Sequence, residues 1–292
     1  MIRRTIPELV AKYRLNPGVR EVYVEGEFDR RVVRWYLNSK QLRDVAVIRI
    51  EMVDVPSAVL SRHALSDGAK SQVIGLGMEL STVCGAALTQ ATCVIDADND
   101  RILDKPPWCN CVVPTDYTSM EMYLVRASLL AKYFQAVLGC EDLDVVDLLR
   151  QYSAILAELF LIRAANEAIN LALRWISFAS AYRNDRALRE FDRDKFIRSL
   201  LQHSSAMGGR DQLLQEIEDL RHKLDGDIRN HSNGHDFLDL LWLDFGTRAK
   251  RCGLQNVEAL SSALRGCIEE AQLDQEQMFV NLVGRVRAVK SA

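Results

Sequence analysis

An acidic cluster made of Asp96, Asp98 and Asp100 directly follows the apolar run of residues 91–95. A carboxylate that leaves water without a partner is costly, so acidic side chains where a buried strand ends are usually paired, cap a turn or bind a metal ion. Residues i and i+2 of a strand point to the same side, so Asp96 and Asp98 can face one cation. Their oxygen donors suit Mg²⁺ or Mn²⁺.

A second acidic group follows the apolar run of residues 19–24. Glu25 ends this run, and Asp29 lies four residues further on. Asp29 could instead cap a helix, and Glu25 could be a solvated loop carboxylate. In a parallel sheet the carboxyl ends of the strands share one edge, where ligands bind. Converging carboxylates repel one another unless cations neutralise them, which favours a metal site.

The residues that surround these groups predict alternating strands and helices. Apolar runs at residues 19–24, 45–50, 91–95 and 110–113 read as strands, with helices at 29–37 and 72–83. This alternation predicts a parallel α/β sheet flanked by helices. Beyond residue 125, apolar residues recur at spacings of three and four, which predicts a mostly helical region. We therefore expect one domain over residues 1–125 and a helical one over 126–292.

Composition limits the function. The 292 residues are 48% hydrophobic with a net charge of −3, so nucleic-acid binding would need a local basic patch. Arginines of the helical half could supply it or could simply solubilise their helices: Arg163, Arg174, Arg183, Arg186 and Arg189. The chain has no secretion signal and no apolar run of 18 residues, and its seven cysteines form no paired framework. These features predict a cytoplasmic protein with no membrane attachment. We expect Cys109 and Cys111 to have a packing role. We expect His203, His222 and His231 to lie at the surface.

Several known motifs are excluded. A calcium loop that begins at Asp96 would need glycine and glutamate where Arg101 and Pro107 stand. Residues 75–77 lack the third glycine of a dinucleotide-binding loop, and residues 68–71 lack the first glycine of a P-loop. Serine or zinc hydrolase motifs are also missing from the sequence.

Two segments carry a resemblance to a family. VEGEFD at residues 24–29 and VIDADND at residues 94–100 resemble the strand-end Glu-Gly and Asp-x-Asp of the TOPRIM domain. Residues 69–74, 115–124 and 233–238 are similar to further segments of a narrower group. Together they resemble the TOPRIM-like, OLD-related nucleases of the defence family that includes AriB, the effector of the PARIS anti-phage system.

This resemblance implies a TOPRIM-type sheet and an Mg²⁺- or Mn²⁺-dependent endonuclease. Glu25 with Asp29 would bind one ion and Asp96 with Asp98 the other, while Asp100 and Glu121 would support them. Lys70 would bind the scissile phosphate, and Glu25 could alternatively be the general base. His235 would be a supporting residue, with residues 233–243 returning toward the active site. Simpler roles remain for three of these residues: a solvated Lys70, a Glu121 that caps a helix, and a His235 that caps the helix after it.

The resemblance also implies a biological setting. A partner ABC-type ATPase would hold the enzyme inactive, and a phage trigger would release it, as a homodimer, to cleave host RNA such as tRNA in abortive infection. RNA is favoured over DNA on this ground alone. The alternatives are a DNA-nicking or DNA-cleaving nuclease and a catalytically inactive binding or regulatory subunit.

Overall fold

A computed structural model describes residues 3–85, 90–185 and 188–289. Its contacts divide the chain into two compact units. The first combines Met1–Ala97, Pro106–Met120 and Glu269–Ala292, and the second combines Asp98–Lys105 and Glu121–Ile268. The units therefore do not follow a single boundary near residue 125, because the C-terminal segment belongs with the first one.

The centre of the first unit is a four-stranded sheet. Its strands are β2 (Glu21–Val24), β3 (Ala46–Arg49), β5 (Ala91–Ile95) and β6 (Val112–Pro114), in the order β3-β2-β5-β6. All neighbouring pairs are parallel. The predicted parallel α/β sheet is thus confirmed, and its predicted strands differ from the observed ones only at their ends.

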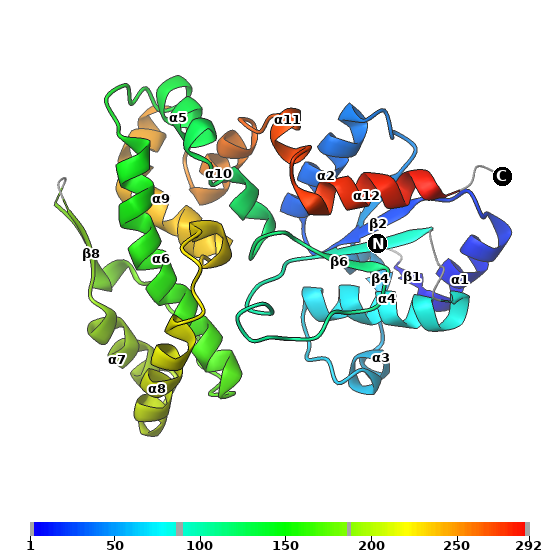
Figure 1. Ribbon diagram of the computed structural model, residues 1–292, viewed down its shortest axis with the longest axis horizontal. Helices are drawn as coiled ribbons and strands as arrows, with labels where there is room; N and C mark the ends of the chain where they lie inside the picture. The colour runs from blue at the N-terminus through cyan, green and yellow to red at the C-terminus, as the bar shows by residue number, and fades with distance from the viewer. Residues whose placement is uncertain (1–2, 86–89, 186–187, 290–292) are drawn as a thin grey trace. The chain divides into compact units, whose positions relative to one another are not determined.

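Alternate residues of the strands face two layers of helices. The face that carries Cys93 packs against α4 (Ala69–Cys84), where Gly77 allows close approach: a Cβ there would lie 2.7 Å from Val112 Cγ2 and 3.4 Å from Cys93 Sγ. The opposite face carries Thr92, which contacts Arg285 of α12 (Gln277–Ala288). Figure 1 shows α4 and α12 on opposite sides of the strands. The second layer also holds α2 (Glu27–Ser39), whose Tyr36 ring packs edge-on against Phe279 of α12.

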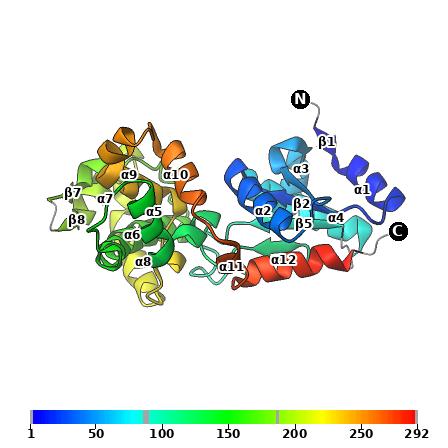
Figure 2. The ribbon, with the colours of Figure 1, turned by 90° about the horizontal axis from the view of Figure 1, so that it is seen from above.

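The N-terminal segment of the chain adds a short strand pair and a helix to the first unit. Strand β1 (Arg4–Thr5) pairs in parallel with β4 (Val53–Asp54). It leads directly into α1 (Ile6–Leu15), as Figure 2 shows. Thr5 and Glu8 form a capping box at the start of α1. The remaining elements of this unit are η1 (Ile50–Met52), α3 (Ser57–Arg62) and α11 (Glu270–Leu273).

A buried charge holds α1 to the sheet. Glu21 at the start of β2 is 2% exposed, and its carboxylate pairs with Arg4 and Lys12. It also accepts hydrogen bonds from the hydroxyls of Tyr13 and Tyr23, at 2.7 and 2.8 Å. Burial alone would raise the pKa of Glu21, but the bonds from Lys12 and the two tyrosines together hold this pKa below its ordinary value.

The second unit is mostly helical, as predicted. Its helices are α5 (Ala127–Ala136), α6 (Val145–Ala168), α7 (Arg193–His203), α8 (Arg210–Arg221), α9 (Gly234–Arg251) and α10 (Val257–Arg265). A short antiparallel hairpin joins β7 (Tyr182–Asn184) to β8 (Arg189–Phe191). The 3₁₀ turns are η2 (Met120–Leu124), η3 (Ala179–Ala181), η4 (Met207–Gly209) and η5 (Ile228–Asn230). Among the described residues, the helices are all too short or too polar to span a membrane.

Candidate functional site

Two strand-end carboxylates are linked at the C-terminal edge of the sheet. The backbone N–H of Asp96 donates a hydrogen bond of 2.9 Å to Oε1 of Glu25. Glu25 follows β2 and Asp96 follows β5, and these strands are parallel neighbours in the sheet. Both residues are partly exposed. The structure therefore brings together the two acidic positions that lie seventy-one residues apart in the chain.

Backbone and hydroxyl groups fix the segment that leaves β5. Oδ1 of Asp96 accepts a hydrogen bond from the N–H of Met120 at 2.9 Å. The N–H of Ala97 donates to Oγ1 of Thr115, which in turn donates to the carbonyl of Tyr117. Thr115 is fully buried, and sequence reasoning assigned it no role of its own. Its position one residue after β6 was the available signal, because the ends of neighbouring parallel strands meet.

Asp29 has the capping role that the sequence left open. Its Oδ2 accepts a hydrogen bond of 2.9 Å from the N–H of Gly26, the residue that precedes α2. Asp29 is 8% exposed. This bond ties the first turn of α2 to the loop that carries Glu25, so Asp29 positions the loop whatever else it binds.

Lys70 reaches the same loop from another element. It lies in the first turn of α4, and its Nζ is 3.4 Å from the carbonyl oxygen of Ala97. Lys70 is partly buried. The simpler expectation of a lysine directed only to solvent is therefore not what the structure has.

The other predicted site residues lie in the second unit. Asp98 has a left-handed backbone (φ 45°), which aspartate tolerates better than most residues. Asp100 forms an ion pair with Lys105 at 2.9 Å. Glu121, in η2, is 7% exposed. His235 is exposed near the start of α9, where Asn233 is the capping residue and accepts a bond from the His235 N–H.

Two of the arginines proposed for a basic surface have internal roles. Arg163 forms two hydrogen bonds of 2.8 Å with Asp236 and stacks on Trp175, and Arg189 pairs with Asp244. Both aspartates are buried. Arg174 donates to the carbonyl of His203, and Arg186 lies outside the described residues.

Other expectations fare differently. His231 was expected at the surface, but it is 8% exposed and bonds to Asp225, so that expectation was wrong. It packs beside the ring of Phe160. The seven cysteines lie in the described part of the chain and are not joined by disulfides. Cys109 and Cys111 lie side by side, and Cys111 lies close to Gly77, consistent with a packing role.

The carboxylates at the sheet edge suit a hard metal ion in type but not as a closed cage. In the part of the chain that the structure describes, no group of three or more His, Cys, Asp or Glu side chains is arranged to hold a metal. Mg²⁺ is usually held by one or two carboxylates with waters and substrate phosphates, so a complete protein cage is not required. Glu25 and Asp96, from adjacent strand ends, supply two such groups.

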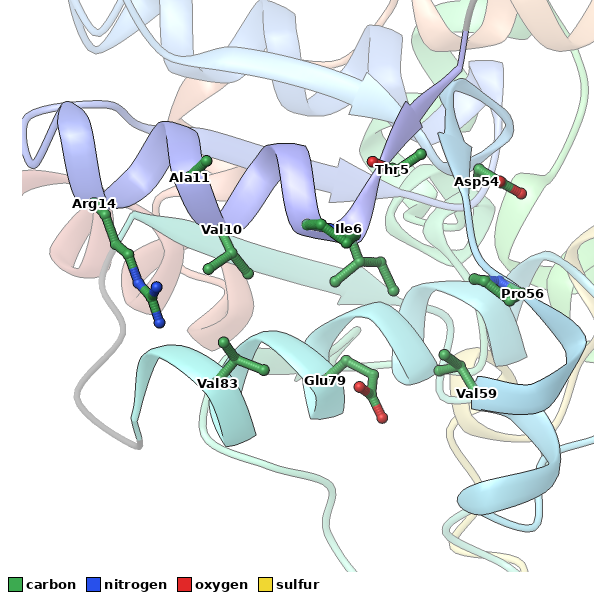
Figure 3. A pocket seen from close by; sticks show the side chains of 11 residues that line it. Thr5, Ile6, Val10, Ala11, Arg14, Asp54, Pro56, Val59, Glu79 and Val83 are labelled. Atoms are coloured by element: carbon green, nitrogen blue, oxygen red, sulfur yellow. The ribbon is translucent and has the colours of Figure 1, made fainter.

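A separate cavity of about 700 Å³ lies away from this edge. Figure 3 shows it between α1 and α4, with Val10, Ile6, Val83 and Val59 along it and Arg14 and Asp54 toward its two ends. None of the predicted site residues lines it. Its wall is mainly apolar, which sets it apart from the acidic edge.

Comparison with known proteins adds no assignment. No protein-family model matches this sequence, and the search of curated proteins gives no significant match.

Proposed function

We propose that this protein is a metal-dependent nuclease whose active site lies at the C-terminal edge of its parallel sheet. The proposal includes a TOPRIM-type arrangement of that sheet. The observation that carries it is the hydrogen bond from the Asp96 N–H to Glu25, which joins the ends of two neighbouring strands. Both positions are among those to which the TOPRIM resemblance assigns a catalytic role.

Each predicted site residue of the first unit has a role in this proposal. Glu25 and Asp96 bind Mg²⁺ or Mn²⁺, and Asp29 holds the loop between β2 and α2 through Gly26. A bound ion would lower the pKa of a water and stabilise the leaving oxygen. Lys70, placed beside Ala97, binds a non-bridging phosphate oxygen and stabilises the developing negative charge. The assignments of Asp98, Asp100, Glu121 and His235 remain predictions from the sequence.

In the reaction, water attacks phosphorus and the bond from phosphorus to the leaving oxygen breaks. The attacking water gives up a proton, and the leaving oxygen gains one. Glu25 is either a ligand or the base that takes this proton. The hydrogen bond from the Asp96 N–H orients the carboxylate of Glu25 for either role.

The biological part of the proposal follows from the resemblance. The enzyme is an anti-phage effector that a partner ATPase holds inactive and that cleaves host tRNA as a homodimer after release. RNA is the proposed substrate, and DNA is the second candidate.

A cleavage assay tests the proposal. Purified protein is incubated with total tRNA, single-stranded RNA or plasmid DNA in Mg²⁺, Mn²⁺ or EDTA, beside Glu25→Gln and Asp96→Asn. The control is Asp54→Asn, which changes an exposed carboxylate at the end of β4 in the same unit. We expect metal-dependent cleavage that both site variants abolish and the control retains.

Three results would count against the proposal in different ways. Cleavage that survives Glu25→Gln would refute the site. Cleavage of plasmid alone would replace RNA by DNA. Binding of nucleic acid without cleavage in any metal would favour the inactive binding subunit.

A further inference from the structure

We propose that a pocket lined by arginines at the edge strand β3 binds phosphate groups of the nucleic-acid strand beside the candidate active site. This inference rests on the proposed function for the identity of its ligand. The pocket has a volume of about 460 Å³. Arg4, Arg30 and Arg49 line it, together with a mainly apolar wall formed by Tyr23, Val47, Ile48, Met52 and Val53.

The pocket adjoins the carboxylates of the sheet edge. Arg49, the last residue of β3, is level with Val24 of β2, and Glu25 is the next residue of the chain. Arg30 follows Asp29 in α2. A strand whose scissile phosphate lay at Glu25 would therefore pass close to these two arginines.

Cations outnumber carboxylates around the pocket. Glu27 accepts hydrogen bonds from Arg30 at 2.7 and 2.8 Å and from Arg31 at 2.7 Å, and it lies 3.5 Å from Arg49. Arg49 also pairs with Glu51 at 2.6 Å. Of the residues that line the pocket, three are arginines and none is acidic.

The lining arginines keep donors for a ligand. A guanidinium group has five N–H donors. Within the described residues, Arg30 uses Nε and Nη2, Arg49 uses Nε and Nη2, and Arg4 uses Nη1 alone. The side chains of Arg4, Arg30 and Arg49 are 53%, 37% and 30% exposed, so their remaining donors can reach a phosphate.

Glu27 acts as a fixed anchor for these arginines. Its carboxylate accepts hydrogen bonds from Nε and Nη2 of Arg30 and from Nε of Arg31. A charged anchor orients the guanidinium groups and reduces the entropy that they lose when a phosphate binds. Arg163 and Arg189 differ, because their own side chains are only 24% and 11% exposed and are held by buried aspartates. We therefore assign the local basic surface to the arginines of this pocket, in the first unit.

Binding without cleavage tests this pocket. The probe is a short, labelled single-stranded RNA, with a DNA of the same sequence as a second arm, and fluorescence anisotropy is measured in EDTA over a salt series. The variant is Arg30→Gln with Arg49→Gln. The control is Arg34→Gln, an exposed arginine of α2 that does not line the pocket.

We expect the double variant to lose affinity by about tenfold for each arginine. Its salt dependence, plotted as log affinity against log salt, should become shallower by about 0.7 for each lost contact. Glu51→Gln removes a competing carboxylate from Arg49 and should tighten binding by roughly twofold to fivefold. Unfolding can weaken binding but cannot tighten it. The Glu51→Gln result therefore tests the pocket even if the double variant fails to fold.

The outcomes separate this inference from the proposed function. A double variant with wild-type affinity and salt slope would overturn the pocket, as would a wild-type protein that binds neither probe. Binding that depends on Arg30 and Arg49, in a protein that cleaves nothing with Mg²⁺ or Mn²⁺, would keep the pocket and reject the nuclease. Cleavage lost in Glu25→Gln with binding retained supports both.

Discussion

The two ends of β2 carry glutamates in contrasting surroundings. At its start, Glu21 is 2% exposed and is bound by the side chains of Arg4, Lys12, Tyr13 and Tyr23. Just beyond its end, Glu25 is partly exposed, and its Oε1 accepts a hydrogen bond from the backbone of Asp96. One glutamate is neutralised by side chains that also connect α1 to the sheet. The other is oriented by the main chain of a neighbouring strand.

This difference shows how one strand can separate stability from chemistry. Side-chain cations at Glu21 satisfy a buried charge, and removing that charge would leave them without a partner. A backbone donor at Glu25 fixes direction without adding a formal positive charge. Substitutions at the two ends should therefore affect different measurable properties.

The largest expected effect is on catalysis at Glu25. Glu25→Gln should lower cleavage by about 10³-fold while the protein remains folded, because an amide is nearly isosteric but cannot serve as base or as a charged ligand. Initial rates and a thermal melt measure the two properties together. If the melting temperature fell together with the cleavage rate, the separation of catalysis from stability at the two ends of β2 would be wrong.

Glu21→Gln should have the opposite profile. We expect a loss of about 3 kcal/mol in the free energy of unfolding, because Arg4 and Lys12 lose the charge that they share. Denaturant unfolding measures this loss. The specific activity of the folded fraction should stay near that of the wild type, and a selective loss of activity would contradict the separation.

The packing of α4 against β6 gives a third test. Gly77→Ala should destabilise the protein by about 2 kcal/mol, since a new Cβ would lie 2.7 Å from Val112 Cγ2 and both residues are buried. Gly284→Ala in α12 is the control, because nothing lies within 4 Å of the Cβ position there. Equal melting temperatures for the two variants would refute the close approach of α4.

Lowering the pH should reduce the free energy of unfolding by protonating Glu21, the same residue that Glu21→Gln changes. The pKa of Glu21 is held below its ordinary value of 4.5, so the folded state binds fewer protons there than the unfolded state. Its contribution is complete above about pH 4.5 and is lost as pH falls below that value. Between pH 6 and pH 3 the wild type should lose about 1 kcal/mol more than Glu21→Gln. Parallel stability curves for the two proteins would contradict this.

The smallest effect is expected at Gly26. Its φ is −136°, and a Cβ there would lie at an ordinary 3.7 Å from Asp29 Oδ2. Gly26→Ala should therefore change stability by less than about 1 kcal/mol. A larger loss, measured by denaturant unfolding, would show that the loop before α2 is more constrained than its backbone indicates.

Much of the sheet was predictable from local signals. Residues 91–95 form a strand because five apolar or β-branched residues precede an acidic turn, and residues 69–84 extend the helix predicted over 72–83. The meeting of Glu25 and Asp96 followed from the rule that parallel strands share a carboxyl edge. The finer TOPRIM assignment stays a prediction.

Other features depend on contacts that periodicity does not encode. The spacing of apolar residues beyond residue 125 predicts helices in general, but it does not say that the helix of residues 277–288 packs on Thr92, almost two hundred residues earlier. Asp116 illustrates the same limit, because its carboxylate accepts the N–H of Met278 at the start of α12. Buried pairs such as Arg163 with Asp236 are likewise invisible to a count of surface arginines.

The place of α12 also has a consequence for how the protein is made. Residues 121–268 leave the ribosome before α12 does, so they can fold while the sheet still lacks this helix on one face. A nascent chain that already displays Glu25 and Asp96 would lack the contacts of Phe279 with Tyr36 and of Arg285 with Thr92. Translation therefore delays the completion of the first unit until its last helix emerges, and products that stop early would carry the acidic edge on an unfinished sheet.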